Sequence, residues 1–181
     1  MKMKTSNKQI ISIAALLILC GCGSPKRPSV EKVPDAYGFF PISGVYLGQT
    51  TVDELWDMGY KPDVEKDSYD CYIDGRAFYD NDKDRLFEKL FISYYSDTND
   101  PTPVEWKEKF GFARELSQSQ WLTLLKKHRL SVEEASLRQI IATTPDKSLK
   151  FKLEFKNEIK DKNTPSALYW LTIYYNGERI E

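Results

Sequence analysis

Three aspartates alternate in one short segment of this chain, and carboxylates at that spacing can bind calcium. Asp80, Asp82 and Asp84 match the first ligands of a twelve-residue calcium loop. Such a loop needs Gly at its sixth position and Glu at its twelfth, where this chain has Arg85 and Phe91. The sequence therefore favours a solvated turn, and we expect no metal site here.

The other reactive side chains do not form a recognisable catalytic set. His128 is the only histidine, and it falls between two basic residues on the apolar stripe of a predicted helix, which favours a structural role over a Ser–His–Asp triad. Phosphate-binding loops, dinucleotide fingerprints and the Gly-x-Ser-x-Gly motif are absent. Carboxylates are frequent between residues 63 and 84, so a carboxylate-dependent hydrolase remains an alternative that no feature favours. We expect no enzymatic activity and no cofactor.

The N-terminus has the layout of an export signal. Lys2, Lys4 and Lys8 precede an apolar run over residues 10–19 that is interrupted only by Ser12. A helix of about ten residues reaches only about half of a bilayer core. We therefore expect a signal segment rather than a permanent membrane span.

Leu19-Cys20-Gly21-Cys22 ends this run and resembles the bacterial lipobox. The resemblance implies that residues 1–21 are a cleaved signal peptide and that the sulfur of Cys22 carries a diacylglyceryl group, with an acyl chain such as palmitate added to its amine. It implies a membrane-anchored lipoprotein of the cell envelope. Because Gly23 rather than Asp follows the cysteine, the outer membrane is the expected location in a host that has two membranes. An ordinary cleaved signal or an uncleaved N-terminal anchor is the alternative.

Charge and cysteine content limit the classes of partner. Removing residues 1–21 leaves 160 residues with 23 basic and 27 acidic side chains, a net charge of −4. This balance does not indicate nucleic-acid binding. If lipid occupies Cys22, Cys71 has no partner within the chain, so no disulfide framework is expected. Cys71 is predicted to be a small buried residue in a strand.

The mature chain divides into a tether and a folded part. Residues 22–36 contain three prolines and few large apolar side chains, which predicts an extended tether after the lipidated cysteine. Residues 37–181 are predicted to form one globular domain, with candidate halves at 37–100 and 101–181.

Helix and strand patterns within the domain predict an α+β fold. Thr51 with Glu54, and Ser117 with Gln120, have the spacing of capping boxes that open short helices. Runs rich in β-branched and aromatic residues predict strands at 71–79, 86–95, 137–143, 149–155 and 168–175. We expect short helices packed on an antiparallel sheet. Each half has a helix followed by strands, which predicts a tandem repeat; chance similarity of two aromatic strands is the alternative.

The segment 44–59, Gly-Val-Tyr-Leu-Gly-Gln-Thr-Thr-Val-Asp-Glu-Leu-Trp-Asp-Met-Gly, resembles the opening of small outer-membrane assembly lipoproteins. It is also similar to the repeat of the β-lactamase-inhibitor-protein fold. In both groups a phrase of this kind leads a short helix, and antiparallel strands follow. The resemblance implies a protein that binds other proteins with the open face of its sheet and catalyses nothing.

Aromatic side chains are concentrated in the predicted strands and are the candidate binding residues. The chain has eleven Tyr, four Trp and nine Phe. Tyr and Trp are preferred anchors of interfaces because they bury a large area with few rotatable bonds. The candidate residues are Tyr94, Tyr95, Tyr169, Trp170, Tyr174 and Tyr175. We expect an envelope protein as the partner; glycan or peptidoglycan binding, and rings that merely cover the sheet, are the alternatives.

Overall fold

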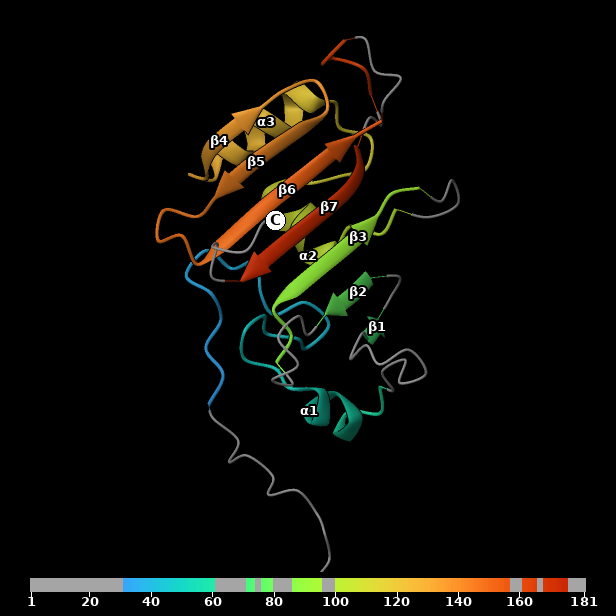
Figure 1. Ribbon diagram of the computed structural model, residues 1–181, viewed down its shortest axis with the longest axis vertical. Coiled ribbons are helices and arrows are strands. Elements are labelled where there is room, and N and C mark those ends of the chain that lie inside the picture. Colours follow the sequence, from blue (N-terminus) through green and yellow to red (C-terminus); the bar gives the residue numbers. More distant parts are fainter. Residues whose placement is uncertain are drawn as a thin grey trace, which may run out of the picture. The chain divides into compact units, whose positions relative to one another are not determined.

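A seven-stranded antiparallel sheet forms the centre of the described structure, with three short helices beside it (Figure 1). This confirms the predicted α+β class. The structure is a computed structural model that describes residues 31–60, 71–73, 76–79, 86–95, 100–156, 161–165 and 168–175. The predicted signal peptide, Cys22 and the turn with Asp80, Asp82 and Asp84 lie outside these residues. Every contact discussed below lies within the unit 32–181.

The elements follow one another in the order expected for helices leading strands. The helices are α1 (Val52–Asp57), α2 (Val104–Phe110) and α3 (Gln118–Lys127). The strands are β1 (Cys71–Ile73), β2 (Arg76–Tyr79), β3 (Lys89–Ser93), β4 (Ser131–Ala135), β5 (Gln139–Thr143), β6 (Leu149–Phe155) and β7 (Leu168–Tyr175). Both predicted capping boxes are present, at Thr51 with Glu54 and at Ser117 with Gln120.

The strand order across the sheet is β1-β2-β3-β7-β6-β5-β4. The last strands of the two predicted halves, β3 and β7, are therefore neighbours at the centre, and each half extends outward from them. Within the described residues the first half contributes one helix and three strands, whereas the second contributes two helices and four strands. The tandem repeat stays a prediction.

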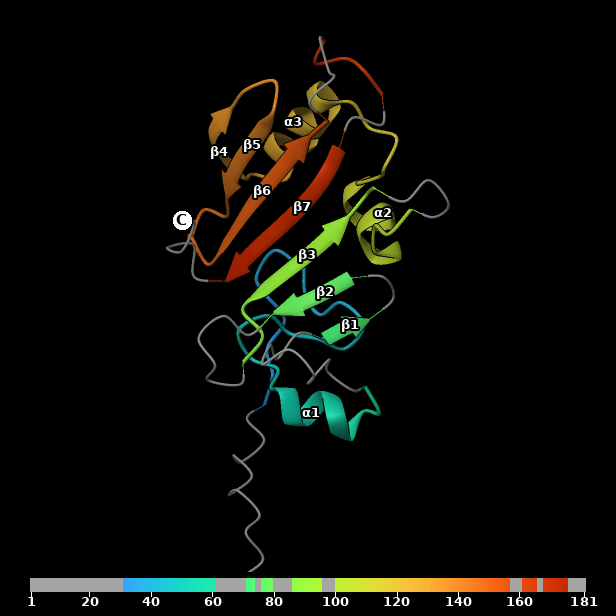
Figure 2. The same ribbon diagram turned by 45° about the vertical axis from the view of Figure 1, so that its right-hand side comes forward.

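One face of the sheet holds the hydrophobic core. Side chains alternate cleanly along β6, where the buried ones are Leu149, Phe151, Leu153 and Phe155. Figures 1 and 2 place α2 and α3 on the same side of the sheet. Their buried side chains and those of the connecting loop are Trp106, Phe110, Phe112, Trp121 and Leu125. Packing these rings against the strands removes apolar area from water at roughly 25 cal/mol per Å², which is the main stabilisation of the fold.

Helix α1 buries a narrower stripe than its sequence suggests. Val52 and Leu55 are fully buried, as expected for one side of a two-turn helix. The spacing of Trp56 in the sequence predicts that it shares this stripe, but its side chain is 49% exposed. A helix of six residues has room for only two inward positions, so the large indole remains outside.

Candidate functional site

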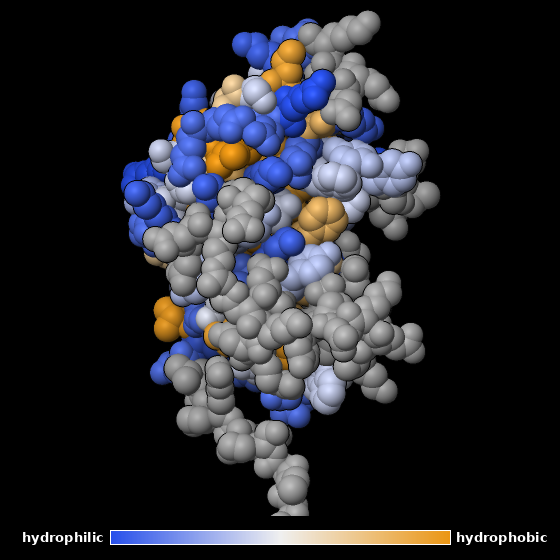
Figure 3. Space-filling model, in the orientation of Figure 1, coloured by the Kyte–Doolittle hydropathy of each residue, from blue (hydrophilic) through white to orange (hydrophobic). Residues whose placement is uncertain are grey.

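The face of the sheet opposite α2 and α3, called the open face below, presents the strand residues that do not enter the core. On β3 and β7 these are Lys89, Phe91, Trp170, Thr172 and Tyr174, which alternate with buried leucines and isoleucines. Among the coloured residues of Figure 3 this side is mainly hydrophilic, with pale side chains of intermediate hydropathy and an orange, hydrophobic side chain between them near the middle of the view. Tyr and Trp have such intermediate hydropathy, so the open face is a candidate interface rather than a core-like surface.

Four rings on β7, on β3 and just beyond the end of β3 form a continuous series, called the aromatic strip below: Tyr95, Tyr169, Trp170 and Phe91. Ring centroids lie 5.5 Å apart between Tyr95 and Tyr169, and 4.3 Å apart between Tyr169 and Trp170. Trp170 lies 6.0 Å from Phe91 on the neighbouring strand. Tyr95 is 71% exposed and the other three rings are partly buried, so the strip has one accessible end and an anchored remainder.

A β-bulge explains how Tyr169 and Trp170 come to lie together. Adjacent residues on a regular strand point to opposite faces. Here Trp170 pairs with Glu154 and Leu168 pairs with Phe155, so Tyr169 is the extra residue on β7. Bulges re-aim side chains in this way. The backbone N–H of Tyr94 donates to the carbonyl oxygen of Tyr169 at 2.9 Å, which keeps the bulged segment attached to the β3 side.

A second group on the open face surrounds the Lys89 ammonium. The Lys89 nitrogen lies 4.5 Å from the centroid of the Tyr79 ring and 5.9 Å from that of Tyr174. A cation over an aromatic ring is attracted by the electron-rich face of that ring. Burial is the largest effect on the pKa of Tyr174 and raises it. The charge of Lys152 lowers this pKa and the charge of Glu154 raises it, both to a smaller degree. Tyr174 is therefore a protonated phenol beside a cation at neutral pH.

Two ion pairs continue the open face toward β4. The Lys152 ammonium lies 3.2 Å from a carboxylate oxygen of Glu154, and the Lys150 ammonium lies 3.4 Å from one of Glu133. The open face thus changes from aromatic at one end of β7 to charged at the other end and on β6.

The structure divides the six sequence-predicted residues into three sets. Tyr95, Tyr169 and Trp170 lie together in the aromatic strip, and Tyr174 lies apart with Lys89. Tyr94 is on the core face and fully buried, and its hydroxyl lies 3.1 Å from that of Thr102. Tyr175 packs against the core from the same face. Sequence reasoning missed Phe91, although its place between Leu90 and Ile92 puts it on the opposite face of β3.

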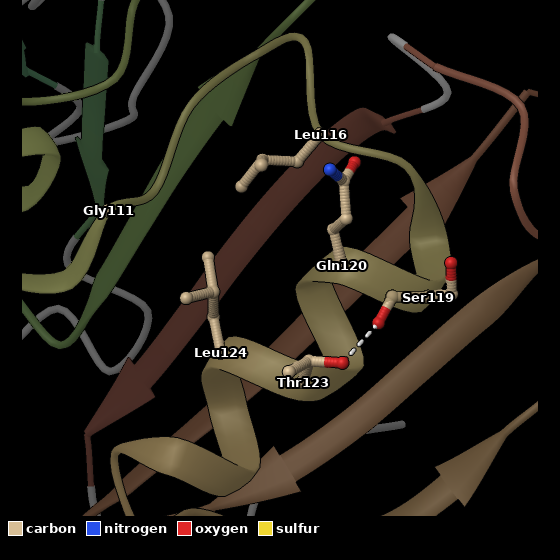
Figure 4. A pocket seen from close by; sticks show the side chains of 6 residues that line it. All are labelled: Gly111, Leu116, Ser119, Gln120, Thr123 and Leu124. Carbon is tan, nitrogen blue, oxygen red and sulfur yellow. Dashed lines mark hydrogen bonds between the residues drawn. The ribbon is translucent and has the colours of Figure 1, made fainter.

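A shallow groove lies on the outer side of α3 and has a volume of about 350 Å³ (Figure 4). Its lining residues are Gly111, Leu116, Ser119, Gln120, Thr123 and Leu124. The Thr123 hydroxyl donates to the carbonyl oxygen of Ser119 at 2.9 Å, inside the helix itself. The lining side chains are all uncharged, so this groove has no group for acid–base catalysis at neutral pH.

The pKa values of Glu54, Asp100 and Asp146 are lowered from their ordinary values. Burial raises the pKa of Glu54, Asp100 and Asp146, but hydrogen bonds outweigh that effect in each, assisted by Lys32 at Glu54 and by Lys107 at Asp100. In the part of the chain that the structure describes, His, Cys, Asp and Glu do not gather in threes that could hold a metal ion.

None of the described helices combines the length and the apolar character needed to cross a membrane. Comparison of the chain with models of protein families, with curated proteins and with solved structures finds no match.

Proposed function

We propose that this protein is a non-catalytic binding module of the bacterial cell envelope, held at a membrane by lipid on Cys22, and that its open face binds another protein. The aromatic strip is the observation that carries the proposal. Four rings in mutual contact, one of them mostly exposed, lie on the side of the sheet that the helices leave uncovered.

The tilts of the rings support a protein rather than a glycan as the ligand. Tyr95 and Tyr169 meet at 88°, Tyr169 and Trp170 at 44°, and Trp170 and Phe91 at 51°. Sugar rings stack on flat aromatic faces, and these rings present edges and faces in different directions. Such a surface suits interdigitating side chains, as at the centre of protein interfaces.

The charged part of the open face supports the same assignment. Protein interfaces combine an aromatic centre with a polar rim that remains hydrated. The ion pairs of Lys152 with Glu154 and of Lys150 with Glu133 lie on the same face as the strip and would form such a rim. Exposed pairs of this kind contribute at most about 1 kcal/mol, so they orient a partner more than they hold it.

Glu54, Asp100 and Asp146 are not suited to act as general acids at neutral pH. A carboxyl that acts as a general acid at neutral pH needs a raised pKa. The perturbed carboxyl groups of Glu54, Asp100 and Asp146 have lowered pKa values and so are ionised at neutral pH.

A photo-crosslinking experiment tests the binding face. A photoreactive phenylalanine analogue would replace Tyr95 in the full-length protein expressed in its own host, and a matched analogue would replace Val104, which is 61% exposed on α2. We expect one protein adduct from position 95 and none from position 104. The proposal is wrong if position 95 gives no protein adduct or if both positions give the same adduct.

An affinity measurement with the captured partner then tests the strip. Tyr95→Ala combined with Trp170→Ala should weaken binding at least about tenfold, because truncating anchor rings costs about 2 kcal/mol or more. Val104→Ala should bind as the wild type does.

Mass analysis of the N-terminal peptide tests the anchor separately. We expect acyl chains on Cys22, and fractionation of the envelope should place the protein with the outer membrane.

A further inference from the structure

We propose that α1 rests on the membrane surface, with the Trp56 indole in the interfacial layer of the bilayer. The inference rests on the proposed lipid anchor at Cys22 and adds a second contact with the lipid. Three observations lead to it: where the chain enters the domain, which apolar side chains are exposed there, and how few residues separate that entry from Cys22.

Hydrogen bonds and an ion pair hold the first residues of the domain beside α1. The Val33 N–H donates to the Gln49 side-chain oxygen at 2.9 Å, and the Gln49 amide donates back to the Val33 carbonyl at 2.8 Å. The Lys32 ammonium lies 2.7 Å from a carboxylate oxygen of Glu54. That carboxylate also accepts from the Thr51 N–H at 2.8 Å in the capping box of α1. The end of the predicted tether is therefore attached to the first turn of this helix.

Large apolar side chains are exposed around this entry. In the described residues, those with substantial exposure are Val33, Trp56, Met58, Tyr95, Val104 and Leu137. Val33 at the entry is 64% exposed, Trp56 of α1 is 49% exposed and Met58 at the end of α1 is 48% exposed. Figures 1 and 2 both place α1 beyond β1, away from β7, so a contact made by α1 leaves the aromatic strip accessible.

The tether keeps α1 close to the lipid. Eleven residues lead from Cys22 to Val33. A chain of that length spans at most about 40 Å even when fully extended. A group held this close to its binding surface has an effective concentration of about a millimolar. Even a weak contact with the lipid therefore forms. Indole rings favour the interface between lipid and water because one edge is polar and the body is apolar.

The charges of α1 define the kind of lipid surface. Asp53 and Asp57 are exposed on the helix, and its last turn has no basic residue. Amphipathic helices that bind anionic membranes have Lys and Arg on the polar face instead. The surface that fits α1 is therefore zwitterionic, and anionic lipid should weaken the contact.

Quenching of tryptophan fluorescence by brominated lipid tests the proposal. The lipidated protein, purified from its host, would be reconstituted into phosphatidylcholine vesicles with brominated acyl chains. Of the four Trp, Trp106 and Trp121 are buried, so Trp56 and Trp170 are the ones to compare. We expect Trp56→Phe to lose at least about half of the quenched signal and Trp170→Phe to keep it. Equal quenching in wild type and Trp56→Phe would overturn the proposal.

Two further measurements separate this proposal from the anchor. Mass analysis of the same sample shows whether Cys22 carries lipid; an unlipidated Cys22 would overturn both proposals. Lipid on Cys22 with an unquenched Trp56 would overturn only the role of α1 and would leave Trp56 to a protein contact. Circular dichroism should show the same fold for both variants, and replacing phosphatidylcholine in part by phosphatidylglycerol should reduce the quenching of Trp56.

Discussion

The indole N–H of Trp106 donates to the carbonyl oxygen of Phe39 at 2.8 Å and so joins residues 67 positions apart. Both side chains are buried. The Phe39 ring also stacks on Phe110 with 4.4 Å between centroids and meets Phe151 of β6 edge-on at 4.8 Å. The segment that opens the domain is therefore held between the helix layer and the sheet, and one hydrogen bond determines its register against α2.

Replacing Trp106 should cost more stability than replacing Trp121. Trp106→Phe leaves the Phe39 carbonyl without its donor, a loss of about 1–3 kcal/mol beyond the lost contacts. The Trp121 indole N–H is buried and has no hydrogen-bond partner among the described residues. Trp121→Phe therefore removes an unsatisfied donor and leaves no acceptor without its donor. Urea unfolding of the two variants measures the difference. Equal losses, or the larger loss for Trp121→Phe, would contradict the role of this hydrogen bond.

Tyr94 should make the fold sensitive to alkaline pH. Burial raises the pKa of Tyr94, and this outweighs the opposing hydrogen bond with Thr102. The folded state therefore keeps the phenolic proton longer than the unfolded chain, whose pKa is 10.0. The associated stability is complete below that pH and is lost as the pH rises above it, by up to about 1.4 kcal/mol per pH unit.

The free energy of unfolding should consequently fall more steeply above about pH 10 in the wild type than in Tyr94→Phe. Tyr95→Phe is the matched control, because that neighbouring side chain is mostly exposed. It should follow the wild-type profile. A Tyr94→Phe profile parallel to that of the wild type would show that another group controls the alkaline transition.

The cap of α3 should contribute measurably to stability. The Ser117 hydroxyl accepts from the Gln120 N–H, and the Gln120 side-chain oxygen accepts from the Ser117 N–H at 2.8 Å. Ser117→Ala removes the first of these bonds and should cost about 1 kcal/mol. Ser131→Ala, at an exposed position of the edge strand β4, should change the free energy of unfolding by less than about 0.5 kcal/mol. Chemical denaturation of both variants measures the contrast.

The sequence predicted the elements whose pattern is local. The alternation along β6 and the two capping boxes are local signals, because the residues that form each are neighbours in the chain. Strand β4 was missed because its side chains are almost all exposed and charged or small, and a bulge near Glu133 interrupts its pairing with β5. An edge strand has no inward stripe to detect, and charge with a bulge protects it from pairing with another chain.

The candidate site was predictable only in part, for a reason of register. Sequence alone indicates that Tyr94 and Tyr95 lie on opposite faces of a strand, but not which of the two faces the core. The bulge at Tyr169 places two adjacent rings in contact, against the alternation of a regular strand. Tertiary pairing decides both points, because a shift of one residue exchanges the faces of a whole strand.

The contact between Gly48 and Tyr175 gives a last prediction. Tyr175 is a candidate binding residue that also packs against the core. Gly48 has a φ of +75°, in the left-handed region that favours glycine, and its N–H donates to the Phe87 carbonyl at 2.6 Å. A Cβ at this position would overlap the Tyr175 ring. Gly48→Ala should therefore cost about 2–4 kcal/mol, from backbone strain and from displacement of the ring.

Gly59→Ala is the matched control, because Gly59 has a φ of +90° and open space around its Cα. Gly59→Ala should therefore lower the free energy of unfolding only by the cost of placing Ala in the left-handed backbone conformation, about 1 kcal/mol. In a Tyr175→Ala background the ring is gone, so the cost of Gly48→Ala should fall to that of Gly59→Ala. A double-mutant cycle from denaturant unfolding measures this coupling. Strict additivity of Gly48→Ala and Tyr175→Ala would show that the ring moves aside freely, and Tyr175 would then remain a candidate for contact with a partner.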